Sequence, residues 1–333
     1  RLIKPRVWQS WWIQWQLVRA LKILAETERI LQPQDGQIEA KGTVISLGAE
    51  AAHVIHALVG LSKEKQGYYS RLFVASQAIL RSGEDYQSAQ LGFQSYLKQH
   101  PNSDLAWFFK GNAHSYLGDY EAAIASYDKA LDIQPSDYAT LYNKGIALDE
   151  LGCHKDAIAA YDQALATRPN LYEALYNKGN ALSNLGHYEA AVIAYNQALA
   201  TKPNLHEALS NKGFALGNLG YHEDAIAAYN QALDIKPDYH EALNSRGIAL
   251  SYLKHYEDAI ASFNQAIQVQ PDNPAPYYNK AWCYGLQGDV DQVLAWLQKA
   301  IDLDPEMCRE AAKNERDFDA VRDDPRFQAL LTD

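Results

Sequence analysis

The residues that could do metal chemistry lie near the start of the chain, where an acidic residue is followed by two histidines. Glu50, His53 and His56 are spaced by three, so a helix would place them on one face, where they could ligate a metal ion. The spacing differs from that of the His-Glu-x-x-His hydrolases, and no further ligand cluster is evident. Helical histidines are more often ordinary surface or packed residues. We therefore expect no metal site.

The other candidates for catalysis form no recognisable constellation. The sequence has no Gly-x-Ser-x-Gly motif, no glycine-rich phosphate loop and no cysteine and histidine paired in a known motif. Several histidines fall at expected turns or helix starts, which are solvated positions. We expect no enzyme activity and no cofactor, so function should rest on binding. These histidines are His154, His187, His206, His222, His240 and His255.

A repeat of fixed length organises most of the chain. Prolines recur every 34 residues, and glycines recur in phase with them. Such a period indicates units that bury their apolar faces only by stacking on their neighbours. The prolines are Pro101, Pro135, Pro169, Pro203, Pro237, Pro271 and Pro305, and the in-phase residues are Gly111, Gly145, Gly179, Gly213, Gly247 and then Ala281.

Each unit shows a helical pattern twice. In residues 138–171, Ala157, Tyr161 and Ala164 belong to one apolar stripe with a period of about 3.6 residues. Gly152 can adopt the left-handed conformation that ends the first helix, and Pro169 ends the second. We therefore predict antiparallel helix pairs that turn at Gly118, Gly152, Gly186, Gly220, Lys254 and Gly288.

The order of large, small, glycine, alanine, aromatic, alanine and proline residues at this period resembles the tetratricopeptide repeat. The first unit carries Trp107, Gly111, Tyr127 and Pro135 at the family's positions. A basic residue precedes the glycine where the family usually has leucine, and we expect its stem to cover apolar surface while its head reaches water. The resemblance implies an all-α fold, a right-handed superhelical α-solenoid of stacked helix–turn–helix repeats with a helical N-terminal extension and C-terminal capping helices. The predicted repeats are 104–137, 138–171, 172–205, 206–239, 240–273 and 274–307.

The resemblance also implies that the first helices line a groove that holds a partner. The sixth position is mostly asparagine, which resembles the ladder that some arrays use to hold an extended peptide by its backbone, because a carboxamide both donates and accepts. Aromatic residues run beside it, although this asparagine is common in the family and the tyrosines could simply pack between repeats. Glutamates at the second position favour a neutral or basic peptide. The predicted groove residues are Asn143, Asn177, Asn211, Asn279, Tyr142, Tyr176, Tyr278, Asn180, Phe214, Trp282, Glu173, Glu207 and Glu241.

The two ends depart from this pattern. Residues 1–69 are expected to form a helical extension, with a Trp-rich amphipathic helix over 5–31, a loop over 32–47 and a further helix. The Trp-rich face could pack on a missing domain or lie at a membrane surface, and packing on protein is the commoner use of such a face. Residues 70–103 are expected to be a divergent repeat and 308–333 acidic capping helices, as in many bacterial arrays. The tryptophans are Trp8, Trp11, Trp12 and Trp15.

Composition narrows the classes of function. The 333 residues carry a net charge of −11, so we expect no general attraction to nucleic acid. Three cysteines form no even framework, which favours a reducing cytoplasm. Because the chain begins with Arg1, we expect it to be cut from something longer. Two functions remain, a scaffold that binds a protein segment or the C-terminal sensor arm of a signalling protein with an ATPase, kinase or protease domain upstream.

Overall fold

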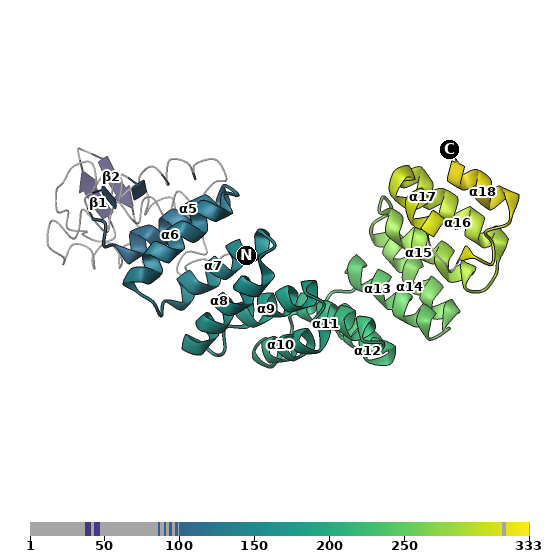
Figure 1. The fold of residues 1–333 in the computed structure, drawn as a ribbon, viewed down its shortest axis with the longest axis horizontal. Helices are drawn as coiled ribbons and strands as arrows, with labels where there is room; N and C mark the ends of the chain where they lie inside the picture. Colours follow the sequence, from purple (N-terminus) through teal and green to yellow (C-terminus); the bar gives the residue numbers. More distant parts are fainter. Residues whose placement is uncertain are drawn as a thin grey trace. The chain divides into compact units, whose positions relative to one another are not determined.

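A computed structural model of the chain describes residues 37–40, 43–46, 86, 90, 93–94, 97–98, 100–314 and 318–332. The chain divides into two compact units, Arg1–Pro169 and Asn170–Asp333. The first unit contains β1 (Gln37–Ala40), β2 (Thr43–Ser46), α5 (Asp104–Tyr116), α6 (Tyr120–Ile133), α7 (Tyr138–Glu150) and α8 (His154–Thr167) (Figure 1).

The second unit is built entirely from helices in its described part. They are α9 (Tyr172–Asn184), α10 (Tyr188–Thr201), α11 (His206–Asn218), α12 (His222–Ile235), α13 (His240–Tyr252), α14 (Tyr256–Val269), α15 (Pro274–Gly285), α16 (Val290–Leu303), α17 (Pro305–Asn314) and α18 (Pro325–Thr332). Consecutive helices within a repeat pack as pairs, and Figure 1 shows these pairs following one another along the chain. The predicted α-solenoid class is confirmed over residues 104–307, where every regular element is a helix.

A β-hairpin in the first unit corrects the loop predicted over residues 32–47. Strands β1 and β2 pair antiparallel, with Gln37 opposite Ser46 and Ala40 opposite Thr43. Two residues separate the strands in the sequence, which is the commonest length of a hairpin connection, and the second of them is Gly42. The prediction weighed the turn residues and overlooked the β-branched residues of the second strand. The Trp-rich segment 5–31 and Glu50, His53 and His56 lie outside the described residues.

The turns within the repeats lie where the glycine lattice predicts them. Gly118, Gly152, Gly186, Gly220 and Gly288 have φ between 74° and 82°. Lys254 takes the equivalent place in the fifth repeat with φ 61°. A side chain in this left-handed region costs roughly 1–2 kcal/mol relative to glycine, so the fifth turn is strained.

A second set of glycines lets the two helices of each repeat approach closely. A Cβ atom built on Gly145 would lie 2.5 Å from Cε1 of Tyr161, which is fully buried. The same arrangement recurs with Gly111 and Tyr127. The sixth repeat has Ala281 at the glycine position and Leu297 at the aromatic position, both buried, so that added volume on one helix accompanies a smaller partner on the other.

Both ends of the repeats are covered by further helical residues. Phe93 and Leu97, from the predicted divergent repeat, are helical, buried and in one cluster with Ala106 and Ala113 of α5. At the other end Phe318 and Phe327 pack against the last repeat, where Arg326 of α18 bonds Asp291 of α16 at 2.8 Å. Helix α17 begins at Pro305, inside the predicted sixth repeat, because proline suits the first turn of a helix.

Candidate functional site

The predicted asparagine ladder is in part an internal network between repeats. Asn143 of α7 is 0% exposed, and its Nδ2 donates to Oδ1 of Asn112 on α5 at 2.9 Å. The hydroxyl of Tyr127 on α6 donates to the same oxygen at 2.8 Å. One carboxamide therefore joins three helices. The Asn143 side chain lies where a partner's backbone does not reach.

The second unit repeats this network with less burial. Nδ2 of Asn211 donates to Oδ1 of Asn180 at 2.9 Å, and the Tyr195 hydroxyl donates to that oxygen at 2.9 Å. Asn279 donates to Asn244 at 2.9 Å. Asn177, Asn180, Asn211 and Asn279 are half-buried, so they retain some access to solvent. The donors whose partners are known join neighbouring first helices, which keeps those helices in register.

The second repeat lacks this hydrogen bond. Tyr161 occupies the place of Tyr127 and Tyr195, but its hydroxyl is buried without a partner. Its repeat has Ile146 at the position of the acceptors Asn112 and Asn180, and isoleucine offers no side-chain acceptor. Burial raises the pKa of Tyr161, so this hydroxyl stays protonated and unpaired. The tyrosine position therefore holds a hydrogen-bonded hydroxyl in Tyr127 and Tyr195 and an unpaired one in Tyr161.

The predicted aromatic row also divides into buried and half-buried members. Tyr142 is 1% exposed and packs against the Tyr161 ring, with 6.0 Å between the centroids. Trp282 of α15 is buried as well. Tyr176 and Tyr278 are half-buried, packed on Tyr195 and Phe318 respectively. Tyr142 is therefore part of the core rather than of a surface that a partner could meet.

Two rings on neighbouring first helices remain open to solvent. Phe214 of α11 is 50% exposed and Tyr252 of α13 is 57% exposed. Phe214 packs edge-on against Tyr188 at 6.3 Å. Tyr252 stacks on His222 at 4.8 Å and meets Trp282 edge-on at 5.4 Å. We call these five residues the aromatic face.

Tyr188, Tyr252 and His222 were missing from the predicted groove residues. Tyr252 occupies the last position of its first helix, and that position holds residues as different as Glu150, Asn184 and Leu286 in other repeats. A row that varies this much gives no periodic signal. Following this position as well as the fifth, sixth and ninth would have found it.

The predicted glutamates lie in the first turns of α9, α11 and α13. The side chains of Glu207 and Glu241 are half exposed, and each lies next to a histidine, with Nδ1 of His206 3.2 Å from Glu207 and Nδ1 of His240 3.1 Å from Glu241. These helices have no side-chain cap, so a negative charge in the first turn also stabilises the helix N-terminus. The glutamates can stabilise the N-termini of these helices and also attract a cation.

The sequence predicted that the heads of the basic residues before the glycines reach water, and this is wrong for Lys144 and Lys280. Lys144 bonds Asp128 on α6 at 2.6 Å. Lys280 is 4% exposed, donates to Asn264 on α14 at 2.7 Å and lies 3.3 Å from the centroid of the Trp296 ring. Burial, followed by the charge of Lys299, lowers the pKa of Lys280 to about 8. Their heads bind the second helix of the preceding repeat.

The described residues lack two features, a cluster of metal ligands and a membrane-spanning helix. They contain no group of three or more histidine, cysteine, aspartate or glutamate side chains that could hold a metal ion. None of their helices combines the length and apolar character needed to cross a bilayer.

Models of known protein families match most of the repeats. Models described as "Tetratricopeptide repeat" match residues 105–137, 142–206, 240–273 and 262–295, and a "TPR repeat" model matches 219–254. No curated protein matches the chain.

Several solved structures are similar. YrrB, described as a TPR protein with an unusual peptide-binding site, is 23% identical with a TM-score of 0.51, and the match covers 56% of this chain and 97% of YrrB. The APC/C hetero-tetramer Cut9–Hcn1 is 17% identical with a TM-score of 0.54, covering 79% of this chain and 48% of the other. MamA is 27% identical with a TM-score of 0.47, covering 48% and 94%. The chain belongs to the tetratricopeptide repeat family.

Proposed function

We propose that this chain is a protein-interaction scaffold, and that an extended segment of a partner protein lies across α11 and α13 on the aromatic face. The observation that carries the proposal is the exposure of Phe214 and Tyr252, two large rings on neighbouring first helices. Each is held by another ring, so little conformational entropy remains to be lost when a partner binds. Rigid, amphipathic rings are favoured anchors at protein interfaces.

The glutamates in the first turns of the same helices favour a neutral or basic segment. Glu207 lies on the same helix as Phe214, and Glu241 lies on the same helix as Tyr252. A lysine or arginine of the partner would meet these carboxylates at half-exposed positions, where the attraction is partly screened by salt. We expect the charge to affect the association rate and the salt dependence more than the final affinity.

The half-buried asparagines can still bind part of a peptide backbone, which is the role predicted for the asparagine ladder. The known hydrogen bonds of Asn211 and Asn279 use their Nδ2 donors. Their Oδ1 atoms are acceptors that a partner's backbone N–H could reach. YrrB, which shares the fold, is described as having a peptide-binding site, and peptide binding by this chain is consistent with that description.

Selection of peptides from a random displayed library tests this proposal. We expect peptides selected on the full chain to combine apolar or aromatic residues with lysine or arginine. Replacing Phe214 and Tyr252 together by serine should weaken their binding by about tenfold or more, as loss of interface anchors does. The serine variant of Ile193, which is 60% exposed on the second helix α10, is the matched control and should bind normally. Equal losses in both variants would refute the aromatic face as the binding surface.

A further inference from the structure

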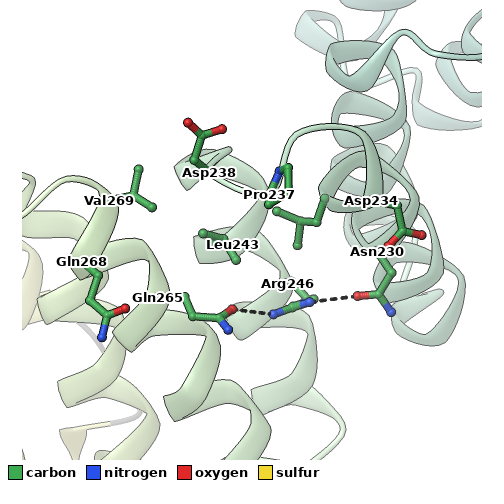
Figure 2. Close-up of a pocket in the computed structure, with 10 residues that line it drawn as sticks. Asn230, Asp234, Pro237, Asp238, Leu243, Arg246, Gln265, Gln268 and Val269 are labelled. Atoms are coloured by element: carbon green, nitrogen blue, oxygen red, sulfur yellow. Dashed lines mark hydrogen bonds between the residues drawn. The ribbon is translucent and has the colours of Figure 1, made fainter.

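A pocket lies between the last turns of α12 and α14, two consecutive second helices of the second unit, and residues of α13 also line it (Figure 2). Its volume is about 510 Å³. The apolar residues of its lining are Leu233, Pro237, Leu243 and Val269. No residue of the aromatic face lines it, so the pocket belongs to a separate surface.

An exposed aliphatic side chain ends each second helix from α12 to α16. Ile235, Val269 and Leu303 are the last residues of α12, α14 and α16, and they are between 40% and 43% exposed. The second and third repeats have Thr167 and Thr201 at the same position. The fold therefore accepts a threonine there, so packing within the chain does not require the aliphatic row.

Acidic residues flank this row in the sequence. Residues 234–238 and the equivalent segments 268–272 and 302–306 contain six carboxylates and a single basic residue, Lys236. The six are Asp234, Asp238, Asp272, Asp302, Asp304 and Glu306. Within the described residues none of them forms an ion pair. The aliphatic row is therefore accompanied by negative charge that the described part of the chain does not neutralise by ion pairing.

Two of these carboxylates occupy helix ends at which a negative charge is unfavourable. Asp234 and Asp302 are next to last in α12 and α16, and neither helix has a basic residue in its last turn. A helix C-terminus carries partial negative charge, so these carboxylates do not stabilise their helices. In the first repeat, Asp132 has the same place beside the exposed Ile133, but Lys129 lies 3.4 Å from it. A cation from a partner would supply what Asp234 and Asp302 lack.

The pocket contains one cation of its own, Arg246. Figure 2 shows it in the lower part of the view and Asp238 in the upper part. Its donors bond neutral acceptors at 3.0–3.1 Å, which are Ser262, Asn230 and Gln265. Lys212, the equivalent residue of the preceding repeat, does not line the pocket. The lining carboxylates Asp234 and Asp238 are exposed and outnumber this cation, so the pocket favours a cationic ligand.

We propose that this edge of the second unit, formed by the pocket and the aliphatic row, docks a lysine-rich amphipathic helix of a protein partner. The apolar face of that helix packs on Ile235, Val269 and Leu303, which removes their exposed surface from water. Its lysines lie beside Asp234 and Asp238. The same carboxylates repel phosphate, so an anionic membrane or a nucleic acid does not fit this surface.

Titration of the full chain with designed peptides tests the proposal by fluorescence anisotropy. The probe has about 14 residues of leucine and lysine, placed so that the leucines share one helical face. A second peptide has the same composition with the leucines scattered around the helix. At about 0.15 M salt we expect a Kd below about 100 μM for the first and binding at least about tenfold weaker for the second. Equal binding of the two peptides would overturn the proposal, because net charge alone would then explain the attraction.

Two pairs of substitutions separate docking from general attraction to an acidic chain. Asp234→Asn with Asp238→Asn should weaken binding by about three- to tenfold. Glu223→Gln with Asp224→Asn removes the same charge from the exposed first turn of α12 and should change the Kd by less than about twofold. Equal losses in the two double variants would refute the assignment of the partner to this edge.

Threonine substitutions test the aliphatic row without disturbing the fold, since Thr167 and Thr201 already occupy the same position. Ile235→Thr with Val269→Thr should weaken binding of the amphipathic peptide by about tenfold. Ile193→Thr, at a more exposed position on α10, is the control and should bind like the parent chain. Unchanged binding in the folded Ile235 and Val269 double variant would overturn the proposal.

The aromatic face supplies the last control, because it is the other candidate surface for a basic segment. Phe214→Ser with Tyr252→Ser should leave binding of the amphipathic peptide unchanged. NMR shifts caused by the peptide should concentrate in the last turns of α12 and α14. Lost binding in this variant together with normal binding in the threonine double variant would place the peptide on the aromatic face and overturn the docking edge.

Discussion

The carboxamide network of α5, α6 and α7 and the aromatic face of α11 and α13 use the same kinds of helix for opposite purposes. In the network, Asn112, Tyr127 and Asn143 are buried and bonded to one another. On the aromatic face, Phe214 and Tyr252 are half exposed, although other rings hold them. The first region has polar groups inside and the second has apolar groups outside.

This difference in burial leads us to expect different roles for the two regions. Buried polar groups stabilise a fold only when they are paired, and the network pairs them across consecutive repeats. Exposed aromatic rings contribute little to the stability of a lone chain, and contiguous exposed apolar surface marks interaction sites. We therefore expect changes in the network to affect unfolding and changes in the aromatic face to affect binding.

The largest loss of stability should come from the glycines on which the first helices depend. Alanine at Gly213 would place a Cβ atom 2.7 Å from the buried Tyr229 ring, and such overpacking costs about 1–3 kcal/mol. Gly217 lies on the same helix with no heavy atom closer than 4.0 Å, so Gly217→Ala should stabilise the helix by about 0.5–1 kcal/mol. Urea unfolding of both variants measures the difference. Similar changes in the free energy of unfolding for Gly213→Ala and Gly217→Ala would show that the close contact with the Tyr229 ring does not determine stability.

Removing the shared acceptor of the network should have the next largest effect. Asn112→Ala takes away the oxygen to which both Tyr127 and Asn143 donate, and a buried polar group that loses its partner costs about 1–3 kcal/mol. We expect the free energy of unfolding to fall by about 2 kcal/mol. Peptide binding at the aromatic face should not change. A free energy of unfolding equal to that of the parent chain would contradict the stabilising role of the network.

The two tyrosines that differ in pairing give a finer test. Tyr127→Phe removes a hydrogen bond of 2.8 Å and should cost about 0.5–1.5 kcal/mol. Tyr161→Phe removes a buried hydroxyl that has no partner, so it should leave stability unchanged or raise it by up to about 1 kcal/mol. Both rings stay in place, which matches the variants in volume. Equal losses at both positions would mean that Tyr161 is satisfied in solution.

The smallest effect should be a dependence on pH from Lys280. Burial lowers its pKa to about 8 in the folded chain, whereas an unfolded lysine titrates near 10.4. Between these values the unfolded chain holds the proton and the folded chain does not, so the free energy of unfolding should rise with pH. The rise should be visible between about pH 8 and 9.5 by comparison with Lys280→Met. Parallel curves for the two proteins would contradict the shift.

The helical array could be predicted from the sequence because its period fixes where each chain reversal occurs. Helices α11 and α13 begin at His206 and His240, the first residues of the predicted repeats. Lys254 adopts the turn conformation that its place in the lattice requires, despite not being glycine. The hairpin lay outside the repeat and gave only a short β-branched signal beside strong turn residues.

The site was harder to predict because repeat position does not fix burial. Asn143 and Asn211 share a position, yet one is buried and the other half-buried. Whether a side chain is exposed depends on its neighbours in the adjacent repeats. Tyr252 contacts His222 of the preceding repeat and Trp282 of the next one, and it remains 57% exposed. Glu207, Glu241 and Phe214 are half exposed, as a place in the predicted groove requires, and their contact with a partner stays a prediction. Tyr252 was missed because its position varies among repeats, where the equivalent residues are Tyr116, Glu150, Asn184, Asn218 and Leu286.

One binding measurement on two variants tests the central claim most directly. A single peptide selected on the parent chain is titrated into Tyr252→Ser and into Asn143→Ala, at a temperature where both are folded. The account predicts that Tyr252→Ser weakens binding by about tenfold. Asn143→Ala should bind within about twofold of the parent although its free energy of unfolding is lower. Weakened binding in Asn143→Ala together with unchanged binding in Tyr252→Ser would contradict it, because the buried carboxamide would then be the recognition element.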